Sequence, residues 1–307
     1  MARLAALLAC GLALAGCGLG AGEKRRGAGA QLHVTRDFGH ARLGEAKLAR
    51  VREGQTVMRF LRSRFEVGTR FGGRFVQSID GLAGGGEGGR VDWFYWVDGV
   101  EAGVGAAEYE LSPGDRVQWD RRDWRATMRV PAIVGAFPEP FLHGFEGKRR
   151  PARVECDDPA RGPCAEVKAR LERAGVSIST STVGAPSGDK VLRVLVAPWK
   201  EARLVGAAAA LEDGPEKSGV FARFAADGRT LTLLDEAGRP ARRVRRGDGT
   251  GIVAATRGSR EELVWLVTAL DRPGLAAAAR ALDQAKLEDA FAVAAGGRAV
   301  QKLPLVR

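Results

Sequence analysis

The sequence predicts an α+β protein in which a β-grasp-like N-terminal domain precedes an α/β domain with a mixed sheet. Two observations support this fold class. In residues 31–124, two short strand patterns, one helical pattern and several aromatic-rich runs follow one another, which is the order of a sheet crossed by one helix. From residue 152 onward, apolar β-branched runs alternate with helical patterns, as in α/β folds.

Length and charge limit the classes of function. A chain of 307 residues with 45% hydrophobic residues is long enough for two globular domains. Its formal net charge of +11 suits attraction to an anionic membrane or to a cell-wall polymer. Nucleic acid is not the expected partner, because neither a recognised fold nor an interleaved basic and aromatic motif accompanies the charge.

The N-terminus has the pattern of a bacterial lipoprotein signal peptide at residues 1–17. A basic start precedes an apolar run at 4–14, which is too short to span a membrane, and the sequence LAGC then ends at Cys17. We therefore expect Cys17 to be lipidated and to hold the exported protein at the outer side of the cell membrane. The alternative is an ordinary secretory signal cleaved nearby. Residues 18–30, GLGAGEKRRGAGA, predict a flexible tether.

The first domain, at residues 31–124, is expected to contain one short helix among its strands. Thr56 is the predicted N-cap, and Val57, Phe60, Leu61 and Phe65 fall on one helical face. The predicted strands cover residues 31–37, 47–52, 74–80, 93–97 and 116–120.

An aromatic stretch, WFYW at residues 93–96, lies at the centre of this domain. Trp93 and Tyr95 must point to one sheet face, and Phe94 and Trp96 to the other, because side chains alternate along a strand. One set then belongs to the core, whereas the other forms a platform for a planar or sugar-like ligand or for a partner domain. The candidate ligand-binding residues are Trp93, Tyr95, the turn residues Asp98 and Gly99, and the loop glycines Gly103 and Gly105.

The motifs REGQTV, FVQSIDGL, WFYWVDGVEAGVGAAEYEL and PGDRVQWD follow one another in this region. In this order they resemble the transcobalamin-like C-terminal domain family, domain of unknown function 4430, over residues 31–124. Family members usually carry Asn-Gly where this chain has Asp98-Gly99. The resemblance implies a β-rich domain related to that of the animal cobalamin carriers, and it makes cobalamin a candidate ligand. In those carriers a large α/α-barrel clasps the ligand from the other side, and this chain has no such barrel.

Residues 125–151, with Pro131, Pro138 and Pro140 among apolar residues, predict an ordered connector between the domains. The second domain, at 152–307, resembles no family that we identify. Its expected strands are at 153–156, 176–183, 190–199, 219–225, 230–240 and 251–257, and its expected helices are at 163–174, 201–214 and after Asp271. Residues 263–270, LVWLVTAL, fit either a buried strand or a helix capped at Ser259.

The cysteines predict one disulfide. If Cys17 carries lipid, Cys156 and Cys164 remain as an even pair in an oxidising compartment. Metal binding or redox chemistry at this pair is the less favoured alternative, because the spacing is not CxxC and no histidine is near.

No catalytic or metal motif stands out. The histidines, His33, His40 and His143, are widely spaced, and the glycine-rich GGGEGG lacks the Lys and Ser/Thr of a phosphate loop. Arg242, Arg243, Arg245 and Arg246 suit either a phosphate or wall-polymer contact or a solvated loop. We therefore expect no enzyme, no resident cofactor and no metal.

Two functional hypotheses follow. The first is a lipid-anchored cell-surface binding protein that presents a site for a small ligand, with a corrinoid as one candidate, or for a membrane transporter that takes the ligand up. The second is a structural or adhesive envelope protein that contacts cell-wall polymer or another surface protein. Saturable binding of a defined small molecule separates the two.

Overall fold

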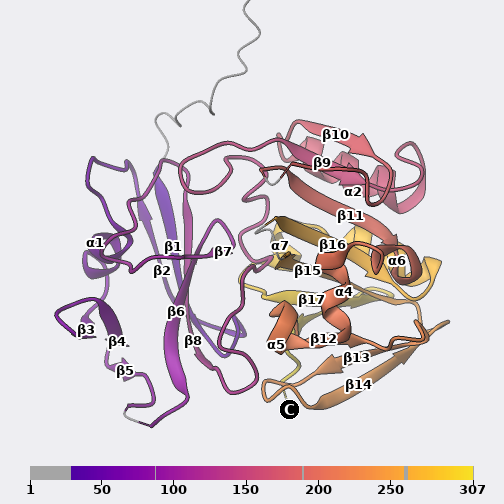
Figure 1. Ribbon diagram of the computed structural model, residues 1–307. Coiled ribbons are helices and arrows are strands. Elements are labelled where there is room, and N and C mark those ends of the chain that lie inside the picture. Colours follow the sequence, from indigo (N-terminus) through magenta and orange to yellow (C-terminus); the bar gives the residue numbers. More distant parts are fainter. Residues whose placement is uncertain (1–28, 87, 189, 259–261, 307) are drawn as a thin grey trace, which may run out of the picture.

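The computed structural model describes residues 29–86, 88–188, 190–258 and 262–306 (Figure 1). The expected signal peptide at 1–17, including Cys17, and most of the expected tether at 18–30 lie outside these residues. None of the helices in the described part is long and apolar enough to cross a membrane. The fold is α+β with two mixed sheets and two smaller ones, which confirms the predicted fold class.

The N-terminal half contains a five-stranded mixed sheet in the order β2-β1-β8-β6-β7. Its first and last long strands, β1 and β8, pair in parallel at the centre of the sheet, an arrangement typical of a β-grasp. The strands are β1 (Ala30–Arg36), β2 (Ala41–Leu48), β6 (Val91–Val97), β7 (Val100–Glu101) and β8 (Arg116–Asp123). A separate small sheet contains β3 (Val67–Arg70), β4 (Phe75–Ile79) and β5 (Leu82–Ala83).

Helix α1 (Val57–Arg62) covers one face of the five-stranded sheet (Figure 1). It begins where predicted, because the side chain of Thr56 accepts a hydrogen bond from the backbone N of Arg59 at 3.2 Å. Phe60 and Leu61 are fully buried in one hydrophobic cluster with sheet residues such as Trp93. The helix therefore closes a core on this side of the sheet.

The second strand lies further upstream than predicted. It covers Ala41–Leu48 rather than residues 47–52, so Gly44, which falls between the two predicted strands, lies inside it. A Cβ atom at Gly44 would come within 2.6 Å of the Phe65 ring, so the missing side chain lets this ring pack against the strand. The hairpin turn instead contains Asp37 and Phe38, both with positive φ.

The second half contains a seven-stranded mixed sheet in the order β10-β9-β11-β16-β15-β17-β18. The first four strands in this order are parallel to one another, and the last three pair antiparallel. These strands are β9 (Ala152–Glu155), β10 (Ile178–Ser181), β11 (Leu192–Pro198), β15 (Thr250–Arg257), β16 (Leu263–Ala269), β17 (Ala292–Gly296) and β18 (Ala299–Leu303). A further three-stranded sheet contains β12 (Ala222–Phe224), β13 (Thr230–Leu234) and β14 (Pro240–Arg245).

Among the described residues of the second half, the helices are short, apart from two. The two longer ones are α2 (Gly162–Arg173) and α6 (Arg272–Ala281), and the latter starts at the predicted cap, where Asp271 accepts a hydrogen bond from Gly274 N at 2.7 Å. The expected helix at 201–214 is wrong as one element, because the chain turns at Val205, the extended cap of α4, and so divides into short pieces. These pieces and the remaining short helices are α3 (Trp199–Ala202), α4 (Gly206–Ala209), η1 (Ala210–Glu212), α5 (Pro215–Ser218) and α7 (Gln284–Leu287).

The structure of this half decides between strand and helix at residues 263–270 and shows whether the two cysteines are bonded. Residues 263–269 form a strand, β16, whose side chains are buried on both faces. The predicted disulfide between Cys156 and Cys164 is confirmed, and it joins the end of β9 to the start of α2.

The second half of the chain covers the other face of the N-terminal sheet. Trp96 is fully buried, with its ring centroid 4.9 Å from that of Phe291. Phe38 packs edge-on against the same ring at 5.3 Å and against Phe221 at 4.8 Å. The five-stranded sheet therefore lies between α1 on one side and the second half of the chain on the other (Figure 1).

Candidate ligand-binding site

Trp93 and Tyr95 point to the side of the sheet that α1 covers, and both are held there by hydrogen bonds. The indole N–H of Trp93 donates to the carbonyl of Leu82 at 3.1 Å, and the Tyr95 hydroxyl donates to the carbonyl of Val104 at 2.5 Å. The Tyr95 ring stacks on Trp119, with centroids 4.9 Å apart. Burial and the nearby Glu108 raise the pKa of the Tyr95 hydroxyl, which therefore stays neutral.

A cavity of about 210 Å³ opens beside these rings. It brings together three of the predicted residues, Trp93, Tyr95 and Gly105. The other walls come from residues that sequence reasoning did not single out, above all Phe75 and Trp119. The complete lining is Arg74, Phe75, Val76, Trp93, Phe94, Tyr95, Glu101, Ala102, Gly105, Ala106 and Trp119.

The other predicted residues lie elsewhere. Asp98 is fully buried, and its side chain accepts a hydrogen bond from the backbone N of Arg116 at 3.0 Å. Asp98 and Gly99 form the tight turn between β6 and β7, both with positive φ. Gly103 is exposed and does not line the cavity. These three positions are thus part of the scaffold around the cavity rather than of its wall.

Trp119 was missed because its place depends on strand register. Tyr95 of β6 lies directly opposite Trp119 of β8 in the antiparallel ladder, which brings the two rings into contact. Alternation along each strand predicts a face for a side chain, but not which residue of another strand lies opposite.

Trp119, which lines the cavity, has a buried indole nitrogen. Trp119 is 3% exposed, and its Nε1 is buried without a hydrogen-bond partner among the described residues. A buried donor without a partner costs free energy. At the rim, Glu101 accepts from the Arg129 side chain at 3.3 Å, and Arg74 is exposed.

Residues 54–122 match the family model described as a domain of unknown function (DUF4430). The match covers less than a quarter of the chain, and it includes all six predicted ligand-binding residues. Among solved structures, the chain is similar to the crystal structure of a proposed metal-binding protein from Ruminococcus gnavus ATCC 29149. That likeness has 13% sequence identity and a TM-score of 0.25, and it covers 31% of this chain and 97% of the other. None of the curated proteins matches the chain.

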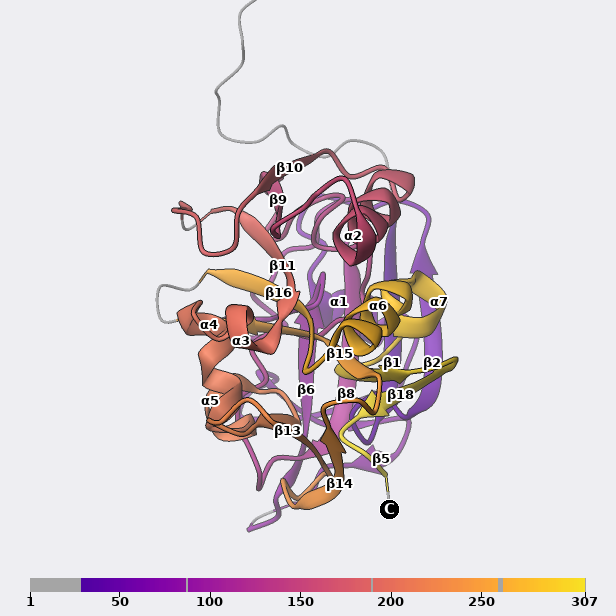
Figure 2. The same cartoon turned by 90° about the vertical axis from the view of Figure 1, so that its right-hand side faces the viewer.

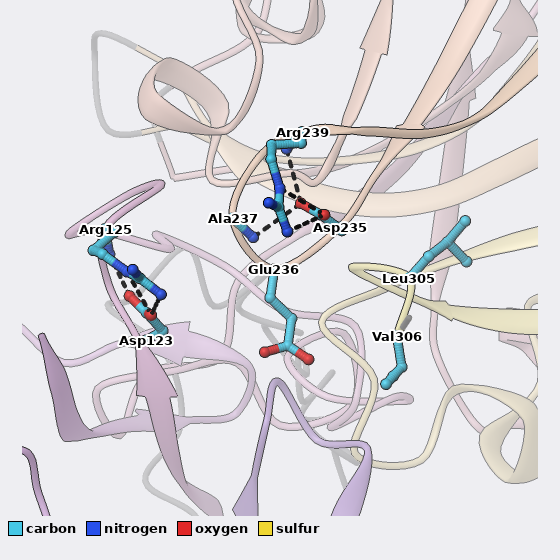
Figure 3. Close-up of a pocket in the computed structure, with 8 residues that line it drawn as sticks. All are labelled: Asp123, Arg125, Asp235, Glu236, Ala237, Arg239, Leu305 and Val306. Carbon is cyan, nitrogen blue, oxygen red and sulfur yellow. Dashed lines mark hydrogen bonds and ion pairs between the residues drawn. The ribbon is translucent and has the colours of Figure 1, made fainter.

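A second cleft, of about 230 Å³, lies between the end of β8 and the second half of the chain (Figure 3). Two carboxylates in it are neutralised: Asp123 bonds Arg125 at 2.7 Å, and Asp235 bonds Arg239 at 3.0 Å. Glu236 lies between these pairs and makes no hydrogen bond or ion pair with a described residue. Burial, together with Asp37, Asp123 and Asp235, raises the pKa of the Glu236 carboxyl.

The described residues contain no group of three or more His, Cys, Asp or Glu side chains placed to hold a metal ion. Each of the three histidines has a partner of its own. His33 Nδ1 lies 2.7 Å from Asp289 Oδ1, His40 Nε2 lies 2.8 Å from the carbonyl of Pro304, and His143 Nδ1 lies 2.5 Å from Glu139 Oε1.

Proposed function

We propose that the protein is an exported, lipid-anchored binding protein whose DUF4430 segment takes a small ligand into the aromatic cavity. The observation that carries the proposal is the lining of this cavity. Trp93, Tyr95 and Trp119 form adjoining walls, and Arg74 and Glu101 add charged groups to the lining. Apolar walls with a few polar groups are typical of small-molecule sites.

The size of the cavity limits the ligand. Sites for drug-sized molecules enclose roughly 300–1,000 Å³, whereas this cavity holds about 210 Å³. A single sugar ring or a small planar molecule suits that space, with a ring face against Phe75. A corrinoid macrocycle is far larger and would have to rest on the rim, so cobalamin is the weaker candidate.

Thermal unfolding of the soluble form that starts at Gly18 tests the proposal. A ligand that binds only the native state stabilises it by RT ln(1 + [L]/Kd), which is about 2.7 kcal/mol at a hundredfold excess over Kd. Monosaccharides, wall glycans, haem, cobinamide and cobalamin are the ligands to compare. We expect the melting temperature to rise by several degrees with one of the sugar-sized ligands.

A pair of phenylalanines provides the matched variants. Phe75 lines the cavity and is 36% exposed, whereas Phe71 is 79% exposed and does not line it. Phe75→Ala should weaken binding several-fold through loss of one ring contact, and Phe71→Ala should leave it unchanged. Equal effects of the two substitutions, or an effect of neither on a ligand that does bind, would place the ligand outside this cavity.

The second candidate is a structural or adhesive envelope protein that contacts cell-wall polymer. It is favoured by a separate observation, a concentration of exposed arginines around β13 and β14 in the second half of the chain. No thermal shift with any small molecule would favour this role.

A further inference from the structure

A strongly basic cleft of about 740 Å³ opens in the second half of the chain. Five of its eight lining residues are cations, one is a carboxylate and none has an apolar side chain. Such a composition in a concave surface concentrates positive potential. The lining consists of Lys200, Arg203, Asp227, Gly228, Arg229, Thr230, Arg245 and Arg246.

The basic cleft lies at the carboxyl ends of two central parallel strands. Lys200 belongs to α3, which directly follows β11 (Figure 2). The guanidinium of Arg246 donates from Nε to the carbonyl of Leu270, the residue directly after β16, at 3.2 Å. Because β11 and β16 are parallel, these ends meet at one edge of the sheet. Ligands of open α/β sheets bind outside this edge.

Most of the cations in the cleft are free of acidic partners. Lys200, Arg229, Arg245 and Arg246 form no ion pair with a described carboxylate, and all four are exposed. Arg203 differs, because it pairs with Glu212 at 2.8 Å and is thereby held in place. Four cations are therefore available to an anionic ligand.

The nearby carboxylates are engaged in shaping turns. Asp227 accepts a hydrogen bond from the backbone N of Arg229 at 2.9 Å, and Asp248 accepts one from the backbone N of Arg245 at 2.8 Å. These contacts hold the backbone and leave both guanidinium groups directed to solvent or to a ligand. The two turn carboxylates therefore bind backbone N–H groups and form no ion pair with the guanidinium groups of Arg229 and Arg245.

The positive surface continues along β14 beyond the cleft. Arg243 and Arg245 are two residues apart on this strand, and both are exposed. They lie opposite Thr232 and Thr230 of β13, so they share one face of the small sheet. Two residues along a strand span about 6.6 Å, a spacing that successive phosphates of a linked chain can follow.

We propose that the basic cleft and the β14 arginines bind a linear polymer of phosphodiester-linked polyols. Guanidinium groups bind phosphate oxygens through paired, charge-assisted hydrogen bonds. A membrane surface fits less well, since surface binders combine basic with apolar side chains and the cleft lining has no apolar one. Single-stranded nucleic acid fits less well, since its binding uses aromatic side chains for stacking and the lining has none.

This inference gives the second candidate role, the envelope protein, a specific site and ligand class. It does not depend on the aromatic cavity. Failure of polymer binding would therefore leave the small-ligand proposal standing, and failure of the small-ligand experiment would leave this one standing.

Binding of purified poly(glycerol phosphate) to the soluble form that starts at Gly18, measured by calorimetry at several salt concentrations, tests the proposal. We expect saturable binding whose log K falls with log salt by roughly 0.7 per phosphate neutralised. The double substitution Arg229→Glu/Arg245→Glu should weaken binding by about tenfold or more and reduce the salt slope by roughly 1.4, because two contacts are lost.

The matched control is Arg50→Glu/Arg52→Glu. Both arginines are exposed in the N-terminal half, and the double substitution changes the net charge by the same amount. We expect the control to retain most of the affinity, and melting temperatures should show that both variants fold. Equal losses in the two variants would mean attraction by net charge alone and would overturn the proposed site.

Three further probes distinguish the ligand. Tighter binding to phosphatidylglycerol vesicles would assign the cleft to a membrane, and tighter binding to oligothymidylate would assign it to nucleic acid. Either result would overturn the proposal, as would the absence of polymer binding. Orthophosphate should bind much more weakly than the polymer, because it contacts only one or two of the four cations at a time.

Discussion

The guanidinium of Arg42 lies 2.6 Å from the carboxylate of Asp289, across 247 positions of sequence. The same carboxylate contacts His33 Nδ1 at 2.7 Å, and the Asp289 carbonyl accepts a hydrogen bond from the side chain of Gln118 at 2.9 Å. Three strands of the N-terminal sheet thus converge on one residue near the end of the chain. Together with the aromatic packing around Trp96, these polar contacts of Asp289 hold the two halves of the chain against each other.

Asp289→Asn should destabilise the protein by on the order of 1–3 kcal/mol, measured by urea unfolding at neutral pH. The carboxylate is 5% exposed, and its removal leaves Arg42 without its closest anionic partner. Asn tolerates the positive φ of this position, so the backbone is retained.

Asp37→Asn is the matched control for that substitution. Asp37 also has positive φ, but its ion pair with Arg36 is exposed, so we expect a loss below about 1 kcal/mol.

Burial alone would raise the pKa of Asp289, but the hydrogen bonds and charges of His33 and Arg42 lower it. The advantage of wild type over Asp289→Asn is therefore present at neutral pH and should shrink as the pH falls through the folded-state pKa, below about 4. An unchanged difference at acidic pH would contradict this account.

Glu236→Gln should raise the melting temperature at pH 7. Burial and three neighbouring carboxylates raise the pKa of Glu236, so the folded state binds its proton more tightly than the unfolded state does. The ionised form therefore costs stability above the unfolded pKa of about 4.3, and the gain from Gln should disappear below that pH. Glu216→Gln, at an exposed position of α5, should have no effect at either pH. A gain for Glu236→Gln that persists at low pH would show that its cause is not the charge.

Loss of the Cys156–Cys164 disulfide should lower the free energy of unfolding by about 2–3 kcal/mol, because the bond restricts a short loop of the unfolded chain. Cys156→Ala/Cys164→Ala is the suitable variant, since both positions are buried and Ala adds no polar group. Wild type in reductant should unfold at nearly the same urea concentration as this variant. An unchanged midpoint of wild type in reductant would contradict the prediction.

Trp96→Ala should cost about 3–5 kcal/mol, because it opens a cavity where the two halves of the chain meet. It also removes the hydrogen bond from the indole N–H to the carbonyl of Val130, which is 2.7 Å long. Urea unfolding followed by circular dichroism measures the loss. Met128→Ala, at a residue that is 56% exposed, should change stability by less than about 0.5 kcal/mol. Comparable losses for the two variants would argue against tight packing at Trp96.

The elements that the sequence predicted well are those determined by local chemistry. Thr56 and Asp271 begin their helices as expected, since a capping side chain reaches only the next few backbone N–H groups. Asp98 and Gly99 form the expected turn, since both tolerate positive φ. The short strands β3, β5 and β7 and the strands β14, β17 and β18 were not predicted. β14 is largely exposed and charged, and β17 is rich in alanine, so neither has the usual strand composition.

The sequence by itself determined the composition of the aromatic stretch and the alternation of its side chains, because alternation is a property of a single strand. Only the tertiary structure decided that Trp93 and Tyr95 face α1 whereas Trp96 faces the second half of the chain. It also decided that Trp119 lies opposite Tyr95 and that Asp289 reaches Arg42. The physical reason is that strand register and the burial of a sheet face depend on contacts between residues far apart in the chain, and no local pattern contains that information.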